Sequence, residues 1–171
     1  AFSNCTSLAS IVVGDSVTSI GYNAFWGCYR LIEVINKSSL NITTGSSYGD
    51  VGYFAKYVKT GESQSAIKTV GNYIFYDDGT DIYLVEYMGS NTEITLPEYD
   101  NGKEFGIWSR AFYDCASLTS IVIPDSVASI GKYAFYRCTS LTSIKYRGTE
   151  LQWQAITKET DWDYEISSYI I

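Results

Sequence analysis

Hydrophobic residues recur along the chain with a fixed period of 23 positions. The pattern is clearest between Ala111 and Tyr146, where one motif is stated twice without slippage. Apolar residues fill the same slots of each copy: Ala111, Phe112, Cys115, Leu118 and Ile121 recur as Ala134, Phe135, Cys138, Leu141 and Ile144. A strict period of this length predicts a solenoid, in which each repeat forms one coil and buries its apolar side against the next.

Each copy predicts two short strands joined by a turn. Leu118, Ile121 and Ile123 are spaced as in a half-buried strand, and a second strand is expected over 127–130. The same two strands are expected over 8–13 and 17–20 of the N-terminal copy. The segment from Ala111 to Cys115 is too short for a full helix, so we expect a single helical or 3₁₀ turn whose Phe fills the core.

The repeat reads A-F-x-x-C-x-S-L-T-S-I-x-I-P-x-S-V-x-S-I-G in its best copies. This motif resembles the BspA-type leucine-rich repeat of surface and secreted proteins in anaerobic bacteria and some protists. The resemblance covers about two coils at each end of the chain. It implies a mostly β, right-handed leucine-rich-repeat solenoid with a parallel sheet on its concave side, displayed outside the cell and engaged in adhesion or binding.

The middle of the chain departs from the period. The 87 positions from Ala24 to Ala111 exceed three strict repeats by 18, so at least one coil is degenerate or interrupted. We expect a four-residue loop insertion near 98–102, an inserted β-hairpin with strands over 72–76 and 82–87, and a short helix near 54–57. The prediction is one solenoid domain over 1–171, with regular repeats at 1–36, an irregular insertion at 37–90, repeats at 91–146 and a C-terminal cap at 147–171.

After Tyr146 the repeat stops and a capping helix is expected. Thr149 stands at an N-cap position with Gln152 three residues later, which is the pattern of a capping box. The end of a solenoid exposes apolar core and open strand edges unless something covers them. We therefore expect Trp153 and Ile156 to be buried against the last coil.

Composition and charge exclude several functional classes. The chain has no histidine, which removes the commonest general base and the usual zinc ligand, and we expect no enzyme activity and no cofactor. A net charge of −7 without basic runs argues against nucleic acid. No apolar run is long enough to span a bilayer. The chain starts inside a repeat and is expected to be an excised piece, monomeric, with any signal or anchor elsewhere.

Cysteines and acidic clusters offer further chemistry, which we interpret as structural. The cysteines occupy one slot of the repeat and should stack as buried thiols, with disulfides as the alternative: Cys5, Cys28, Cys115 and Cys138. Two acidic groups invite calcium, one at 77–81 and one alternating over 161–165 as a strand would present it. The spacing at 77–81 does not reproduce a calcium loop, so a solvated turn is favoured there. Exposed termini are often acidic, which favours a structural interpretation of 161–165, and no metal site is predicted.

Candidate binding residues come from two columns of outward-facing side chains. The position after each Phe holds Trp26, Tyr113 and Tyr136, and aromatic side chains of this kind anchor partners or stack on sugars. Trp108 is a similar exposed candidate. If the core residues point inward, Glu33 and Lys145 lie on the concave sheet. For all of these the alternative is a purely structural role.

These observations favour a non-catalytic, extracellular or cell-surface binding module that recognises a protein or glycan. Solenoids offer extended surfaces suited to this role. The alternative is a structural spacer, a rigid stalk that presents another domain and binds nothing itself. The sequence leaves the choice open, and the irregular part between the repeats is where function is most expected.

Overall fold

The computed structural model describes residues 1–47 and 49–166, and these form mainly short β-strands. The chain divides into two compact units, Ala1–Ile67 and Lys68–Ile171, and each has its own apolar core. The expected mostly β solenoid with parallel sheets is confirmed in both units. The single domain expected over 1–171 stays a prediction, and its last five positions lie outside the described residues.

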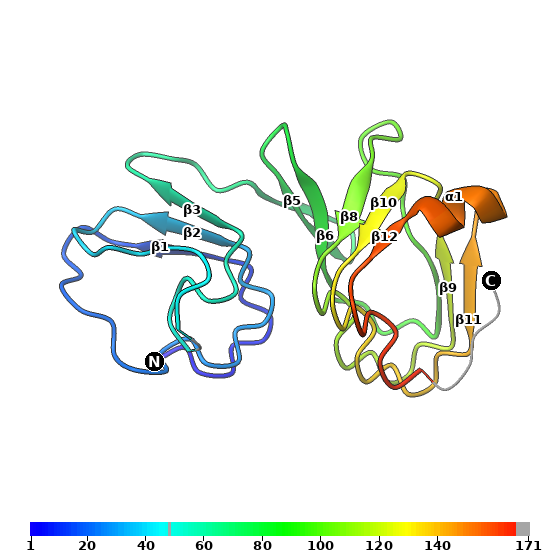
Figure 1. The fold of residues 1–171 in the computed structure, drawn as a ribbon, viewed down its shortest axis with the longest axis horizontal. Coiled ribbons are helices and arrows are strands. Elements are labelled where there is room, and N and C mark those ends of the chain that lie inside the picture. Colours follow the sequence, from blue (N-terminus) through cyan, green and yellow to red (C-terminus); the bar gives the residue numbers. More distant parts are fainter. Residues whose placement is uncertain (48, 167–171) are drawn as a thin grey trace. The chain divides into compact units, whose positions relative to one another are not determined.

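The first unit contains three stacked coils. Strands β1 (Ser10–Val13), β2 (Glu33–Asn36) and β3 (Tyr57–Thr60) form one parallel sheet and lie side by side in Figure 1. Ser10 pairs with Glu33, and Glu33 pairs with Tyr57, so the spacing from β2 to β3 is one residue longer than the spacing from β1 to β2. The predicted helix near 54–57 is wrong, because this segment turns directly into β3. Residues 37–60 are therefore a coil and not an insertion.

The second strand predicted over 17–20 does not form in the first unit. The segment after β2 in the neighbouring coil forms no strand either, and the Asn36 side chain holds the start of that segment as a loop. Its amide nitrogen donates to the Leu40 carbonyl at 2.8 Å, and its amide oxygen accepts from the Ser38 backbone at 3.0 Å. Backbone groups engaged in this way are lost to a sheet ladder.

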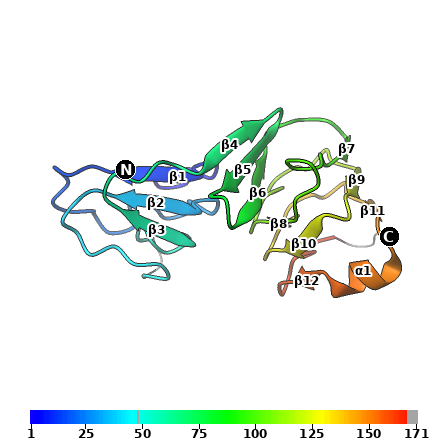
Figure 2. The ribbon, with the colours of Figure 1, turned by 90° about the horizontal axis from the view of Figure 1, so that it is seen from above.

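The second unit contains two sheets. Strands β7 (Glu93–Thr95), β9 (Ser120–Ile123) and β11 (Ser143–Tyr146) form a parallel three-stranded sheet, visible in Figure 2. Glu93 pairs with Ser120, and Ser120 pairs with Ser143. The first spacing is four residues longer than the second, as expected from the insertion near 98–102. That loop contains Asp100 and Asn101, both with positive φ.

The other sheet of the second unit incorporates the hairpin. Its order is β12 (Thr157–Lys158), β10 (Val127–Ile130), β8 (Phe105–Ile107), β6 (Ile82–Tyr87), β5 (Tyr73–Asp77) and β4 (Ile67–Val70). Strands β5 and β6 form the predicted antiparallel hairpin, and β6 also pairs with β8 in parallel. The hairpin thus extends the six-stranded sheet with strands from the part of the sequence that does not follow the repeat.

Stacked phenylalanines fill the core at the repeat slot after alanine. Phe112 and Phe135 have ring centroids 5.0 Å apart with planes inclined by 15°, and Phe2 and Phe25 repeat this geometry at 5.0 Å and 14°. Phe112 and Phe135 are completely buried. Trp162 closes this column with an edge contact to Phe135 at 6.1 Å.

The C-terminal cap forms as predicted. Helix α1 (Glu150–Ala155) begins at Thr149, whose hydroxyl accepts from the Gln152 backbone while the Gln152 side chain accepts from the Thr149 backbone. Trp153 and Ile156 are both buried in the core of the second unit. Among the described residues, no helix has the length and apolar character needed to cross a membrane.

The four cysteines are thiols stacked in two pairs, one in each unit. Cys28 and Cys138 are buried, and their thiols donate to the carbonyls of Phe2 and Phe112 at 3.0 and 3.1 Å. Cys5 is exposed and Cys115 is half-buried, so the predicted burial holds for the inner member of each pair only. Burial raises the pKa of Cys28, and a hydrogen bond with Cys115 together with burial raises the pKa of Cys138.

Candidate functional site

Exposed aromatic and basic side chains gather on the turns that follow β8, β10 and β12. We name this group the tyrosine–arginine surface, and it consists of Tyr113, Tyr133, Tyr136, Tyr164, Arg110 and Arg137. The three strands are neighbours in the six-stranded sheet, so the turns that follow them also lie side by side (Figure 1). The sheet therefore positions residues that are far apart in the sequence.

Each of these turns has the same backbone, which we call the double turn. In the middle one the Tyr136 amide donates to the Tyr133 carbonyl at 3.0 Å, and the Cys138 amide donates to the Phe135 carbonyl at 3.0 Å. Residues before the alanine and before the cysteine take positive φ, 56° at Tyr133 and 64° at Arg137. These left-handed residues stop helical propagation, so the predicted single helical or 3₁₀ turn is replaced by two consecutive turns.

The double turn forms once more over 161–166, beyond the recognisable repeat. The amides of Tyr164 and Ile166 donate to the carbonyls of Asp161 and Asp163 at 3.2 and 3.0 Å, which is the pattern of the previous coil. Asp161 and Glu165 have φ values of 61° and 71° at the matching positions. The strand considered for this acidic stretch is therefore wrong, and Tyr164 continues the column begun by Tyr113 and Tyr136.

The four tyrosine rings form a continuous ladder. Tyr136 lies at the centre, with ring centroids 5.7 Å from Tyr113, 5.6 Å from Tyr133 and 5.8 Å from Tyr164. Tyr133 also contacts Tyr164 edge-on at 5.6 Å. Tyr164 is 49% exposed and the other three rings are half-buried. Mutual packing thus fixes the rings while part of each stays open to solvent.

Basic groups lie over these rings. The Arg137 guanidinium lies 5.8 Å from the Tyr113 centroid and 5.7 Å from that of Tyr136, within the range of a cation–π contact. Arg110 and the Lys132 ammonium each lie 4.9 Å from the Tyr133 ring. A hydrogen bond with Tyr136 raises the pKa of Arg137 above its usual value. Lys132 is in addition 3.6 Å from an Asp161 carboxylate oxygen.

The structure separates the residues singled out from the sequence. Tyr113 and Tyr136 belong to the tyrosine–arginine surface, whereas Trp26 lies in the first unit and is 37% exposed. Trp108 is half-buried with its ring 5.3 Å from Tyr83. Lys145 is exposed on β11, beside Val122 of β9.

Sequence reasoning missed Tyr133, Tyr164, Arg110 and Arg137. A signal for three of them was present: Tyr133, Arg110 and Arg137 directly precede the alanine or cysteine of the repeat. Tyr164 had no such signal because its coil carries Trp and Asp at the alanine and phenylalanine slots.

Glu33 faces outward from β2, yet it is completely buried. Residues after β3 cover it: the Ser65 hydroxyl donates to Glu33 at 2.8 Å and the Ala66 amide at 3.2 Å. Ser10 donates at 2.7 Å and Lys59 forms an ion pair at 2.9 Å. Burial alone would raise the pKa of Glu33, but these hydrogen bonds outweigh it and lower the pKa. The expectation of Glu33 as an accessible binding residue on the sheet is corrected, because its carboxylate is fully used inside the protein.

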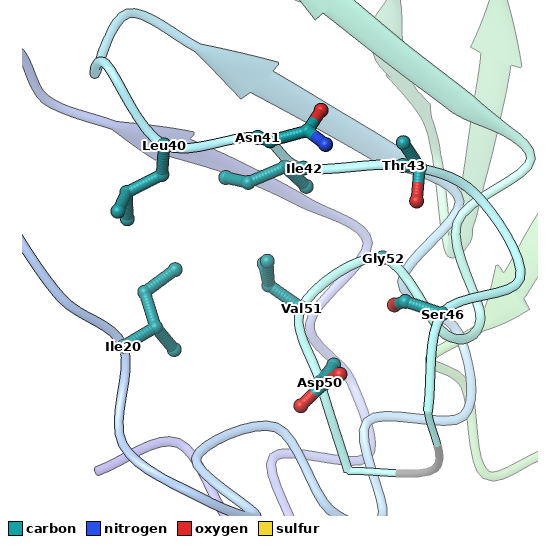
Figure 3. A pocket seen from close by; sticks show the side chains of 9 residues that line it. All are labelled: Ile20, Leu40, Asn41, Ile42, Thr43, Ser46, Asp50, Val51 and Gly52. Atoms are coloured by element: carbon teal, nitrogen blue, oxygen red, sulfur yellow. The ribbon is translucent and has the colours of Figure 1, made fainter.

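A pocket of about 240 Å³ lies in the first unit between Ile20 and residues 40–43, 46 and 50–52. Figure 3 shows Leu40, Ile42 and Val51 together with Asp50 and Ser46 around it. The pocket lies beside Ile20, at the end of the segment 17–20, where a second strand is predicted and does not form. Its lining mixes aliphatic side chains with the polar side chains of Asn41, Thr43, Ser46 and Asp50.

The acidic hairpin turn uses its carboxylates within the fold. Asp77 is buried and accepts from the Tyr99 hydroxyl and the Gly79 amide, both at 2.9 Å, besides forming an ion pair with Lys68. Asp78 accepts from the Thr80 and Asp81 amides, each at 3.0 Å. The expected solvated turn is thus incorrect for Asp77. The described residues contain no cluster of three or more His, Cys, Asp or Glu placed to hold a metal ion.

Acid should weaken the fold through Asp77. The ion pair with Lys68, followed by the Gly79 and Tyr99 hydrogen bonds, lowers the Asp77 pKa to about 2 from 3.8 despite burial. A lowered folded-state pKa means that the stabilisation is complete above about pH 4 and is lost as the pH falls towards 2. We expect the stability advantage of the wild type over Asp77→Asn, measured by urea unfolding, to shrink by up to about 2 kcal/mol between pH 5 and 2. A difference that stays constant over this range would contradict the assignment.

Coils stacked at intervals of 23 residues, with parallel sheets and a repeated double turn, define a leucine-rich-repeat solenoid. The chain belongs to the family described as BspA type Leucine rich repeat region, whose sequence model matches six copies over residues 1–103 and 106–156. A search of curated protein sequences finds no match.

Solved structures of bacterial leucine-rich-repeat proteins are similar to parts of the chain. A leucine-rich repeat protein from Bacteroides capillosus is 31% identical over 47% of this chain and 65% of its own, with a TM-score of 0.40. The T. pallidum leucine rich repeat protein is 30% identical over 46% of this chain and 38% of its own, with a TM-score of 0.41. A leucine rich cell surface protein from Faecalibacterium prausnitzii is 19% identical over 93% of this chain and 65% of its own, with a TM-score of 0.44. The chain thus spans less than two thirds of each of these proteins.

Proposed function

We propose that this chain is a non-catalytic binding module of a cell-surface or secreted protein and that it recognises a protein or glycan partner. The observation that carries the proposal is the tyrosine–arginine surface. Tyrosine and arginine are the residues most enriched at binding hot spots, and here they are ordered before any partner arrives. Membership of the BspA-type family supports the extracellular setting.

A panel experiment tests this function. The isolated chain is applied to a glycan array and to an array of secreted bacterial and host proteins, in parallel with Tyr136→Ala and Trp26→Ala. Tyr136 is the centre of the ring ladder, so we expect its replacement to abolish the strongest signal while Trp26→Ala, in the other unit, retains it.

The structural spacer predicts a different result in the same experiment. A stalk binds nothing, so the wild type would give no signal on either panel. Equal signals from the wild type and both variants would show binding at another face and would remove the tyrosine–arginine surface from the proposal.

A further inference from the structure

We propose that the tyrosine–arginine surface binds a protein partner that presents an acidic side chain to the Arg137 guanidinium. This inference rests on the proposed binding function and names its site and its partner chemistry. Three features of the surface support this inference. They are the left-handed backbone at its charged and aromatic positions, the ion pairing of Arg137, and the arrangement of cations over the rings.

The first feature is the choice of residues at left-handed backbone positions. In the first unit the double-turn slots with positive φ hold Asn4, Asn23 and Gly27, the residue types that adopt this conformation most readily. In the second unit the matching slots hold Arg110, Tyr133 and Arg137, together with the acidic residues Asp114, Asp161 and Glu165. Large side chains in this conformation are disfavoured.

The two units differ in which residues occupy these left-handed slots, and this difference is informative. The first unit forms the same double turn with asparagine and glycine in these slots, so the turn itself does not require arginine or tyrosine there. Strained backbone retained without a folding benefit is typical of functional positions. Arg110, Tyr133 and Arg137 bear this strain and belong to one surface, which indicates that their side chains are retained for contact with a partner.

The second feature is the availability of Arg137. Its guanidinium is held over Tyr113 and Tyr136, and Asp114 raises its pKa only through a minor charge interaction. Among the described residues, the ion pairs within 4.0 Å do not include Arg137. By contrast, Lys132 on the same turn already faces Asp161. Arginine recognises carboxylates through two parallel hydrogen bonds, and tyrosine rings beside it exclude water from such a pair. A partner carboxylate therefore fits this position.

The third feature favours a protein over a glycan. Sugar rings bind by stacking on the faces of aromatic rings, but cations lie over the faces of Tyr113, Tyr133 and Tyr136. A rigid group of tyrosines around an arginine is the composition of protein-binding hot spots and of antibody paratopes.

Selection from a phage-displayed random peptide library tests the partner chemistry. The library is selected on the wild-type chain, and a synthetic copy of the enriched peptide is measured by calorimetry against Arg137→Gly and Asn4→Gly. Both variants place glycine in the same double-turn slot, where Gly27 already occurs, so both should fold, and a thermal melt of each checks this. A neutral and uronic-acid glycan array is run with the same proteins.

We expect the enriched peptides to contain Asp or Glu and to bind Arg137→Gly at least about tenfold more weakly, with Asn4→Gly unchanged. Replacing the peptide acid by its amide should cost the wild type a similar factor and cost Arg137→Gly little, which is the signature of a direct pair. Peptides without acidic residues, or affinities insensitive to Arg137→Gly, would overturn the partner chemistry and leave the binding function standing. Arg137-dependent binding to glycans alone would overturn the choice of a protein, and no binding to any probe would overturn both proposals.

Discussion

Replacing Phe135 by alanine is expected to lower the free energy of unfolding of the second unit by about 3–5 kcal/mol. Phe135 is completely buried between Phe112 and Trp162. Truncation therefore removes buried apolar contacts and leaves a cavity, which the neighbouring coils cannot fill because their strands are paired with each other. The measurement is urea unfolding followed by tryptophan fluorescence, since Trp108, Trp153 and Trp162 all lie in this unit.

An exposed apolar residue provides the control for this substitution. Leu151 lies on α1 and is 77% exposed, so Leu151→Ala should change the stability by no more than about 0.5 kcal/mol. If Phe135→Ala cost as little as Leu151→Ala, the stacked-coil core would be incorrect.

Replacing Glu33 by alanine should destabilise the first unit by about 3 kcal/mol or more. The substitution leaves the Lys59 ammonium, two serine hydroxyls and the Ala66 amide without their shared acceptor, and breaking one side of a buried ion pair is costly. Urea unfolding of this unit, monitored by Trp26 fluorescence, gives the value.

The chain offers a closely matched control for Glu33. Glu93 occupies the corresponding first position of strand β7 and is exposed, so Glu93→Ala should alter the stability of the second unit by about 0.5 kcal/mol or less. Equal losses from the two substitutions would contradict the buried network around Glu33.

The contrast between Glu33 and Glu93 shows where sequence reasoning ends. Glu33 is predicted to face outward from its strand, and Glu93 takes the equivalent first position of β7, since register follows from the repeat. Only the path of the segment after β3 determines that Glu33 is covered. That path depends on contacts between residues more than 30 positions apart, which no periodicity encodes.

The coils themselves could be predicted because their apolar slots are regular. The Phe112–Phe135 stack, the hairpin, the loop insertion and the capping box of α1 all follow from local patterns. Two segments misled the prediction for physical reasons. Residues 37–60 form a coil with a polar, aromatic-rich sequence, and 161–166 repeat the double turn without its usual residues, because backbone hydrogen bonds to the neighbouring coil fix both.

The candidate surface was half visible in the sequence. Tyr113 and Tyr136 follow the phenylalanine slot and were found from the repeat. Arg137 and Tyr133 join them because the residues before cysteine and alanine take left-handed conformations, which turn these side chains towards the same column. A period identifies equivalent positions, but only the backbone conformation shows which of them share a surface.

The most direct test of this account is hydroxyl-radical footprinting of the chain with and without the partner found on the binding panels. The account predicts that oxidation of Tyr113, Tyr136 and Tyr164 slows in the complex, while residues on the outward face of β7, β9 and β11 keep their rates. Protection of that sheet face, with the three tyrosines still oxidised at their original rates, would contradict the assignment of the tyrosine–arginine surface as the binding site.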